Sequence, residues 1–199
     1  MAGVNVFIET DRLMLRRFTV DDLGLLVELD SDPEVKRYID NGAAADPTDL
    51  AEMLQWWLGY YDRYQGYGFW AAIEKSTGLF VGWFHLRPGE GAGPREPELG
   101  YRLRRQVWGQ GYATEVSEAL IDKAFAELHA NRVYASTMMV NVASRRVMEK
   151  AGLRYVRAFQ VDWPVKIPGD EQGDAEYAID RVQWENDRAA GLGAATDPP

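Results

Sequence analysis

Cysteine is absent from this sequence of 199 residues, and histidine occurs only twice, as His85 and His129. A chain without cysteine forms no disulfide bond, no thiolate metal site and no cysteine nucleophile. Two histidines are also too few for the usual sets of zinc ligands, so we expect a site that uses no metal. The chemistry must then rest on oxygen and nitrogen groups.

Positive charge and long apolar runs are scarce as well. The chain has 22 Lys and Arg against 31 Asp and Glu, which gives a formal net charge of −9 at pH 7. Because neutralising phosphates requires clustered Lys and Arg, this balance argues against a nucleic-acid partner and mildly favours a cationic acceptor. No apolar run reaches the roughly 18 residues of a membrane span, and the first residues show no signal-peptide pattern. We therefore expect a cytoplasmic protein without a membrane partner.

The length and the hydrophobic content of 46% suit one sizeable core. The chain shows no internal repeat and no linker between domains. We predict a single domain over residues 1–185 and a disordered tail over residues 186–199.

Hydrophobic periodicity predicts a strand, then helices, three strands, a helix, a strand, a helix and two final strands. The predicted strands cover residues 8–16, 69–75, 79–87, 98–103, 132–138, 154–159 and 175–181. The predicted helices cover residues 20–29, 33–39, 47–64, 111–128 and 141–150. This mixture indicates an α/β protein.

A glycine-containing segment from Gln106 to Ala113 lies between a predicted strand and a long predicted helix. Gly109 and Gly111 allow a tight turn with bare N–H groups, and the start of the helix adds about half a positive charge. A P-loop is excluded because no Gly-Lys-Ser/Thr ends the segment. The segment also lies outside the first βαβ unit, where a dinucleotide-binding Rossmann domain carries its glycines. We therefore predict a phosphate cradle of another kind.

Gln106, Gly109 and Gly111 fill the three positions of a Gln/Arg-x-x-Gly-x-Gly/Ala signature, so the segment resembles that of the GNAT acyltransferase superfamily. A second block, which runs from Asn141 through Ser144 to Leu153, resembles the Rim-type branch, whose members acetylate ribosomal-protein N termini. Asn141 and Ser144 also suit a simple helix cap, and capping can coexist with ligand contact.

The resemblance covers about residues 8–183 and implies the α/β GNAT fold. That fold has a mixed, mostly antiparallel central sheet, flanked by helices, whose central strands splay apart beside the phosphate loop. It further implies acetyl-CoA as cosubstrate and no metal. Main-chain N–H groups of the loop would hold the pyrophosphate, and the edge of the strand at residues 99–103 would pair with the pantetheine arm. The implied cofactor-binding residues are Leu99, Tyr101, Leu103, Arg104, Gln106, Gly109, Gln110, Gly111, Tyr112, Ala113, Asn141 and Ser144.

Acyl transfer to an amine needs a neutral nucleophile, a stabilised oxyanion and a proton for the departing thiolate. Glu98 is the predicted base, acting directly or through a water, and its alternative role is a structural pair with an arginine. Ser144 is the candidate for protonating the thiolate, as the resemblance to Rim-type enzymes implies. The N–H groups near Leu99 and Tyr101 would hold the thioester oxygen. His85 is a reserve base, although a packed side chain is the commoner role for such a histidine.

The pKa of the acceptor amine limits which class of amine the enzyme is expected to acetylate. At pH 7, deprotonating a lysine with a pKa of ~10.4 costs roughly 4 to 5 kcal/mol, whereas an α-amine near ~7.8 costs only about 1 kcal/mol. We therefore expect a protein or peptide N-terminal α-amine. Two alternatives stay open: acetylation of a small-molecule amine such as a polyamine, amino acid or antibiotic, and a non-catalytic module that binds acyl-CoA.

An aromatic face and an acidic loop are the candidate acceptor elements. Trp56, Trp57, Tyr60, Tyr61 and Tyr64 recur at helical spacing, which fits core packing, an acceptor pocket or a homodimer contact. In relatives the loop corresponding to residues 160–174 covers the acceptor, and here it holds Asp162, Asp170, Glu171 and Asp174. Those carboxylates would attract a cationic substrate or remain solvated.

Overall fold

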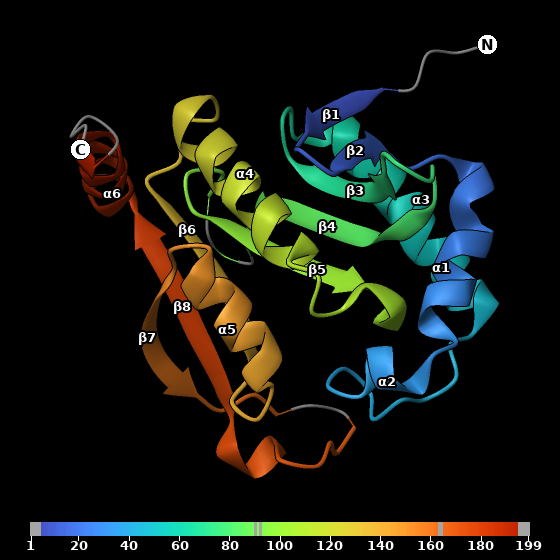
Figure 1. Cartoon of the computed structure of the whole chain (residues 1–199). Helices are drawn as coiled ribbons and strands as arrows, with labels where there is room; N and C mark the ends of the chain where they lie inside the picture. Colours follow the sequence, from blue (N-terminus) through green and yellow to red (C-terminus); the bar gives the residue numbers. More distant parts are fainter. Residues whose placement is uncertain (1–4, 90, 92, 163–164, 195–199) are drawn as a thin grey trace.

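A single mixed sheet organises the chain, whose computed structural model describes residues 5–89, 91, 93–162 and 165–194. Within these ranges the sheet has eight strands in the order β1-β2-β3-β4-β5-β6-β8-β7 (Figure 1). The strands are β1 (Val6–Glu9), β2 (Leu13–Arg17), β3 (Gly68–Glu74), β4 (Phe80–Pro88), β5 (Pro97–Leu103), β6 (Arg132–Met138), β7 (Arg154–Phe159) and β8 (Asp174–Asp180). Neighbouring strands are antiparallel except for β5 and β6, which are parallel. The predicted fold class is confirmed.

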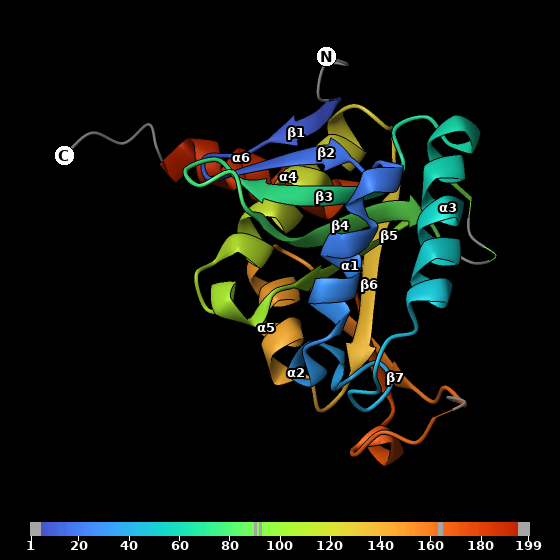
Figure 2. The same cartoon turned by 90° about the vertical axis from the view of Figure 1, so that its right-hand side faces the viewer.

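Helices cover both faces of the sheet. They are α1 (Leu23–Asp30), α2 (Pro33–Lys36), α3 (Pro47–Arg63), α4 (Tyr112–Ala126), α5 (Val142–Lys150) and α6 (Arg181–Ala194). Helices α4 and α5 lie on one face, and α1 and α3 lie on the other (Figure 2). None of the helices in the described ranges is both long and apolar enough to cross a membrane.

Local signals start α3 and α5 where the sequence predicts them. The side chain of Asp46 accepts a hydrogen bond from the N–H of Thr48 at 2.7 Å, and Pro47 takes the first position of α3. At the start of α5, Asn141 accepts from the N–H of Ser144 at 3.2 Å. Satisfying these otherwise unpaired N–H groups is what fixes the helix starts.

The predicted first strand over residues 8–16 is two strands, β1 and β2, joined by a tight turn. The N–H of Thr10 donates to the carbonyl of Leu13 at 2.9 Å, which closes the turn. The turn lies in a run of four polar residues, Glu9 to Arg12, and the prediction of one continuous strand overlooked this local signal.

The disordered tail predicted over residues 186–199 is wrong up to residue 194, because residues 181–194 form α6. Contacts with α4 hold the helix in place, and its mostly polar sequence does not predict them. Arg181 donates to the carbonyl of Phe125 at 2.7 Å, and the indole of Trp184 donates to Asp122 at 2.6 Å. Trp184 also lies against Phe125, with ring centroids 5.2 Å apart. The part of this prediction that concerns residues 195–199 lies outside the described residues.

The sheet opens between β5 and β6. Strand β5 pairs with β4 along its whole length, but it meets β6 only where Glu98 lies opposite Tyr134. Beyond that point the two strands diverge (Figure 1). The splay that the resemblance implied is confirmed, and the edge of β5 over residues 99–103 faces the gap without a strand partner.

Candidate active site

The glycine loop follows β5 and leads directly into α4. Gly109 has φ +74 and Gly111 has φ +83, both in the left-handed region that side chains other than glycine rarely adopt. In the described part of the chain, the N–H groups of residues 109–111 form no hydrogen bond. Those of Tyr112 and Ala113, the first residues of α4, have no acceptor within the helix. These N–H groups surround a helix N terminus and suit an anion without a metal.

The side chain of Arg12, which no sequence motif indicated, holds this loop in place through a set of contacts that we call the brace. Its Nη1 donates to the carbonyl of Gln110 at 2.8 Å, and its Nε donates to Glu115 at 2.6 Å. The guanidinium also lies over the ring of Tyr112, 4.5 Å from the centroid. No local pattern points to this contact, because Arg12 and Gln110 are 98 positions apart in the chain.

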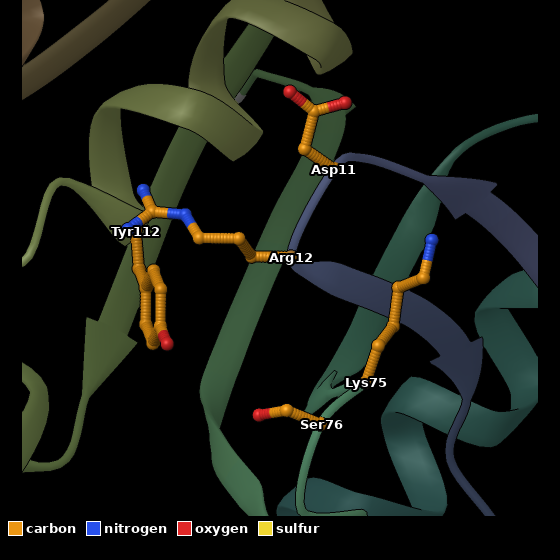
Figure 3. Close-up of a pocket in the computed structure, with 5 residues that line it drawn as sticks. All are labelled: Asp11, Arg12, Lys75, Ser76 and Tyr112. Carbon is orange, nitrogen blue, oxygen red and sulfur yellow. The ribbon is translucent and has the colours of Figure 1, made fainter.

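A surface pocket of about 500 Å³ lies beside the brace, lined by Asp11, Arg12, Lys75, Ser76 and Tyr112 (Figure 3). The hydroxyl of Tyr112 donates to Glu74, and Lys75 lies 3.3 Å from Glu9. Because the cations at this pocket already have carboxylate partners, its walls support the loop and offer little to a further anion.

Replacing Arg12 with alanine is expected to weaken acetyl-CoA binding about 5-fold. The Arg12–Glu115 pair is partly exposed, so its loss is worth on the order of 1 kcal/mol, felt as a less preorganised loop. Titration calorimetry with acetyl-CoA measures the change. Arg154→Ala, which removes an exposed arginine paired with Asp187 elsewhere on the surface, is the matched control. Equal affinities in the two variants would contradict the bracing role.

The side chains near the loop are less available to an anion than the N–H groups of the loop are. Arg104 pairs with Glu28 at 2.7 Å and Arg105 pairs with Asp32 at 3.3 Å, so a phosphate would have to compete with both carboxylates. The carbonyl of Gln106 accepts from the side-chain amide of Gln110 at 3.0 Å, and this bond shapes the turn.

Glu98 lies at the root of the gap, at the single residue pair that joins β5 to β6. Its Oε2 accepts from Arg87 at 2.7 Å and lies 3.9 Å from Nε2 of His85. Oε1 takes part in neither contact. The structure therefore contains the arginine pairing that was the alternative role, and it also places a carboxylate where the strands part.

His85 is unsuited to the reserve role. Burial, reinforced by the cation of Arg87, lowers its pKa to about 3, so it is neutral and a poor proton acceptor at pH 7. Neither ring nitrogen has a hydrogen-bond partner among the described residues, and the ring centroid lies 5.1 Å from that of Phe69 and 5.8 Å from that of Trp83. His85 is therefore a packed side chain, which is the commoner role for such a histidine.

Ser144 and Asn141 lie across the gap from β5. Asn141 uses its Oδ1 to cap α5 and its Nδ2 to donate to Thr137 at 3.1 Å, so its side chain is engaged in local structure. The Oγ of Ser144 is 3.0 Å from the hydroxyl of Tyr101, which comes from β5. Sequence reasoning placed Tyr101 on the cofactor edge but did not find this partner, because the two residues are 43 positions apart.

The aromatic face of α3 divides between core and surface. Trp57 is 2% exposed and stacks on Phe69 with centroids 4.5 Å apart, and the hydroxyl of Tyr61 donates to the carbonyl of Phe69. Trp56 and Tyr64 are 43% and 39% exposed. Core packing therefore explains only part of the pattern.

Tyr60 connects α3 to the site around Glu98. Burial raises the pKa of Tyr60 while the nearby cation of Arg87 opposes the shift, which places this ring close to the Glu98–Arg87 pair. Tyr60 itself is buried, but its ring contacts the exposed rings of Trp56 and Tyr64, with centroids 5.4 and 4.7 Å away.

The acidic loop is partly tied down in the described residues. Asp170 lies 3.6 Å from Lys166 and accepts from the N–H of Ile167 at 3.4 Å. Asp174 is buried at the start of β8. The four carboxylates therefore do not form one solvated cluster.

Residues 12–154 match the family model described as an acetyltransferase (GNAT) domain. The chain belongs to the GNAT family. It is 32% identical over 183 residues to the FsC-acetyl coenzyme A-N(2)-transacetylase of Aspergillus fumigatus, a match that covers 89% of this chain and 77% of that one. A GNAT-family acetyltransferase from Bacillus anthracis superposes with a TM-score of 0.71 at 25% identity, covering 88% and 98% of the two chains.

A structure of RimL, a ribosomal L7/L12 alpha-N-protein acetyltransferase in complex with coenzyme A, has the same fold, with a TM-score of 0.74 at 16% identity and coverage of 88% and 98%. This GNAT chain is therefore an acetyl-CoA-dependent N-acetyltransferase that acts on an amine acceptor.

Proposed function

We propose that this GNAT enzyme acetylates the α-amine of a protein or peptide N terminus by direct attack in a ternary complex. The observation that carries the proposal is the position of Glu98. Its carboxylate lies where β5 and β6 part, and its charge acts on Tyr60 of α3, whose ring contacts the exposed rings of Trp56 and Tyr64. A single carboxylate suffices for an amine that is largely neutral near pH 8, whereas lysine demands more of the base.

The residues present fit the cofactor. The left-handed glycines leave two positions of the loop without a side chain, and its unpaired N–H groups would hold the pyrophosphate of acetyl-CoA. The free edge of β5 would pair with the amides of the pantetheine arm. No group of three or more His, Asp or Glu side chains in the described ranges could hold a metal. The N–H groups of the loop would offset the charge of the pyrophosphate.

Each catalytic role would fall to a residue that borders the gap. Glu98 would accept the proton of the attacking amine, directly or through one water. Main-chain N–H groups near Leu99 and Tyr101 would stabilise the oxyanion. Ser144 would donate a hydrogen bond to the departing sulfur. We assign these roles from the positions of the residues along the gap. No charged group other than Glu98 takes part in them.

A second candidate is acetylation of a small-molecule amine. It is favoured by the 32% identity to a relative named for transacetylation at N(2) of FsC. The acceptor side of the two candidates differs, whereas the cofactor side is shared, so cofactor binding cannot distinguish them.

A screen of amines separates the candidates. The enzyme is incubated with acetyl-CoA and peptides that have free N termini, the same peptides with blocked N termini and an internal lysine, polyamines, or amino acids. Thiol release and mass spectrometry report transfer. We expect kcat/KM at least 100-fold higher for free N-terminal peptides than for blocked ones. Transfer confined to small amines would replace the proposal with the second candidate, and transfer to no amine would refute both.

A further inference from the structure

We infer that Tyr101 is a positioning residue, whose hydroxyl orients the hydroxyl of Ser144 so that the serine hydrogen faces the gap. The inference rests on the proposed function and adds a residue to it. It starts from one contact, a hydrogen bond between two side chains that belong to opposite halves of the opened sheet.

The geometry is well defined on both sides of the gap. Tyr101 lies opposite Phe84 in the β4–β5 pairing, and its hydroxyl is 3.0 Å from Oγ and 3.3 Å from the carbonyl oxygen of Ser144. Ser144 is held in turn by its N–H, which donates to Asn141 in the cap of α5. The only β5–β6 strand pairing in the described ranges is Glu98 with Tyr134, and the hydroxyl pair adds a side-chain link between β5 and α5 on the two sides of the gap.

The direction of this hydrogen bond decides what Ser144 can do. A phenol is a more acidic donor than an alcohol, and a serine oxygen has two lone pairs to accept with. When Tyr101 donates to Ser144, the serine keeps its own hydrogen for a further acceptor. The acceptor that the reaction supplies in the gap is the sulfur of the departing thiolate.

Tyr101 keeps its own proton throughout. Burial raises the pKa of Tyr101 to about 12, although a hydrogen bond that Ser144 would donate to the deprotonated phenolate opposes the shift. Transfer of that proton to a thiolate whose conjugate thiol has a pKa near ~8.5 would be unfavourable by a factor of about 3,000. Tyr101 is therefore an orienting donor and not the source of a proton.

The acetyl transfer balances without a further reactant. The amine nitrogen forms the new C–N bond, the C–S bond breaks, and its electron pair remains on sulfur. The proton leaves the nitrogen for Glu98 or a water next to it. The thiolate accepts a hydrogen bond from Ser144, whose oxygen accepts one from Tyr101.

A double-mutant cycle on the full chain tests the inference with the amine found in the screen. We expect Tyr101→Phe to lower kcat about 10-fold, which is the loss of one net hydrogen bond. The KM and the dissociation constant for acetyl-CoA should stay within about 2-fold. Because Tyr101 acts through Ser144, the double variant should be no slower than Ser144→Ala alone.

Tyr61→Phe is the matched control. Tyr61 also carries a buried hydroxyl that donates a hydrogen bond, here to the carbonyl of Phe69, and burial raises its pKa to about 12 as well. Both phenylalanine variants should lower the melting temperature by similar amounts, but only Tyr101→Phe should lower kcat.

Three outcomes would overturn the inference. They are losses that add in the double variant, a loss in cofactor affinity in place of kcat, and an equal fall in kcat for Tyr61→Phe. If the unmodified enzyme transfers acetyl to no amine, the proposed function itself fails and this role fails with it. If the unmodified enzyme is active but the losses of the two variants add, only the role of Tyr101 is refuted and the proposed function stands.

Discussion

Replacing Gly111 with valine is expected to raise the dissociation constant for acetyl-CoA at least 100-fold, roughly 3 kcal/mol. Gly111 has φ +83, where a β-branched residue is strained by on the order of 1–3 kcal/mol, and an added Cβ would lie 3.4 Å from Nη2 of Arg12. The valine would relax by moving the N–H groups that begin α4, and the anion site depends on their convergence. Titration calorimetry gives the affinity, and thermal unfolding shows that the variant is folded.

Gly78→Val is the control for Gly111→Val, because it introduces similar backbone strain away from the phosphate-binding loop. Gly78 lies in the turn between β3 and β4 with φ +72, and no atom comes within 4 Å of an added Cβ. This variant should lose a similar amount of stability and bind acetyl-CoA normally. A folded Gly111→Val variant with unchanged affinity would refute the cradle assignment and, with it, the cofactor side of the site.

Replacing Glu98 with glutamine is expected to lower kcat about 100-fold while acetyl-CoA binding stays within about 2-fold. Glutamine has the same shape and its carbonyl can still accept from Arg87, but it takes up no proton at neutral pH. Removal of a general base commonly costs 10²–10⁴-fold, and a water relay brings the loss to about the low end. Steady-state kinetics with the amine from the screen measures the change.

Glu96→Gln is the control for this substitution. Glu96 is exposed and lies two positions away, before β5 begins, so its replacement removes the same charge without touching the gap. Its kcat should equal that of the unmodified enzyme. If Glu98→Gln also retains full turnover, Glu98 is only a structural partner of Arg87 and the base lies elsewhere.

The cofactor half of the site was accessible from the sequence because its determinants are local. Two glycines with left-handed backbone, a strand before them and a helix after them are all encoded within a short stretch, and the structure shows that loop. The same holds for the Asn141 cap of α5. Helix starts and tight turns depend on neighbouring residues, so motif spacing predicts them.

Contacts between distant segments were not accessible in this way. The brace of Arg12 on the loop and the Tyr101–Ser144 bond each join separate elements of the sheet and helices. The mostly polar sequence of α6 was likewise misread, because its order comes from contacts with α4 and not from its own periodicity.

The amino-acid order alone therefore determined the fold class, the glycine loop and the helix caps, which follow from backbone conformation and hydrophobic period. Tertiary structure alone decided how the loop is braced, which hydroxyl Ser144 meets and that His85 is a buried neutral ring. The reason is physical. Backbone preferences act over a few residues, whereas burial, ion pairing and pKa depend on every element packed around a group, and those neighbours exist only after the chain has folded.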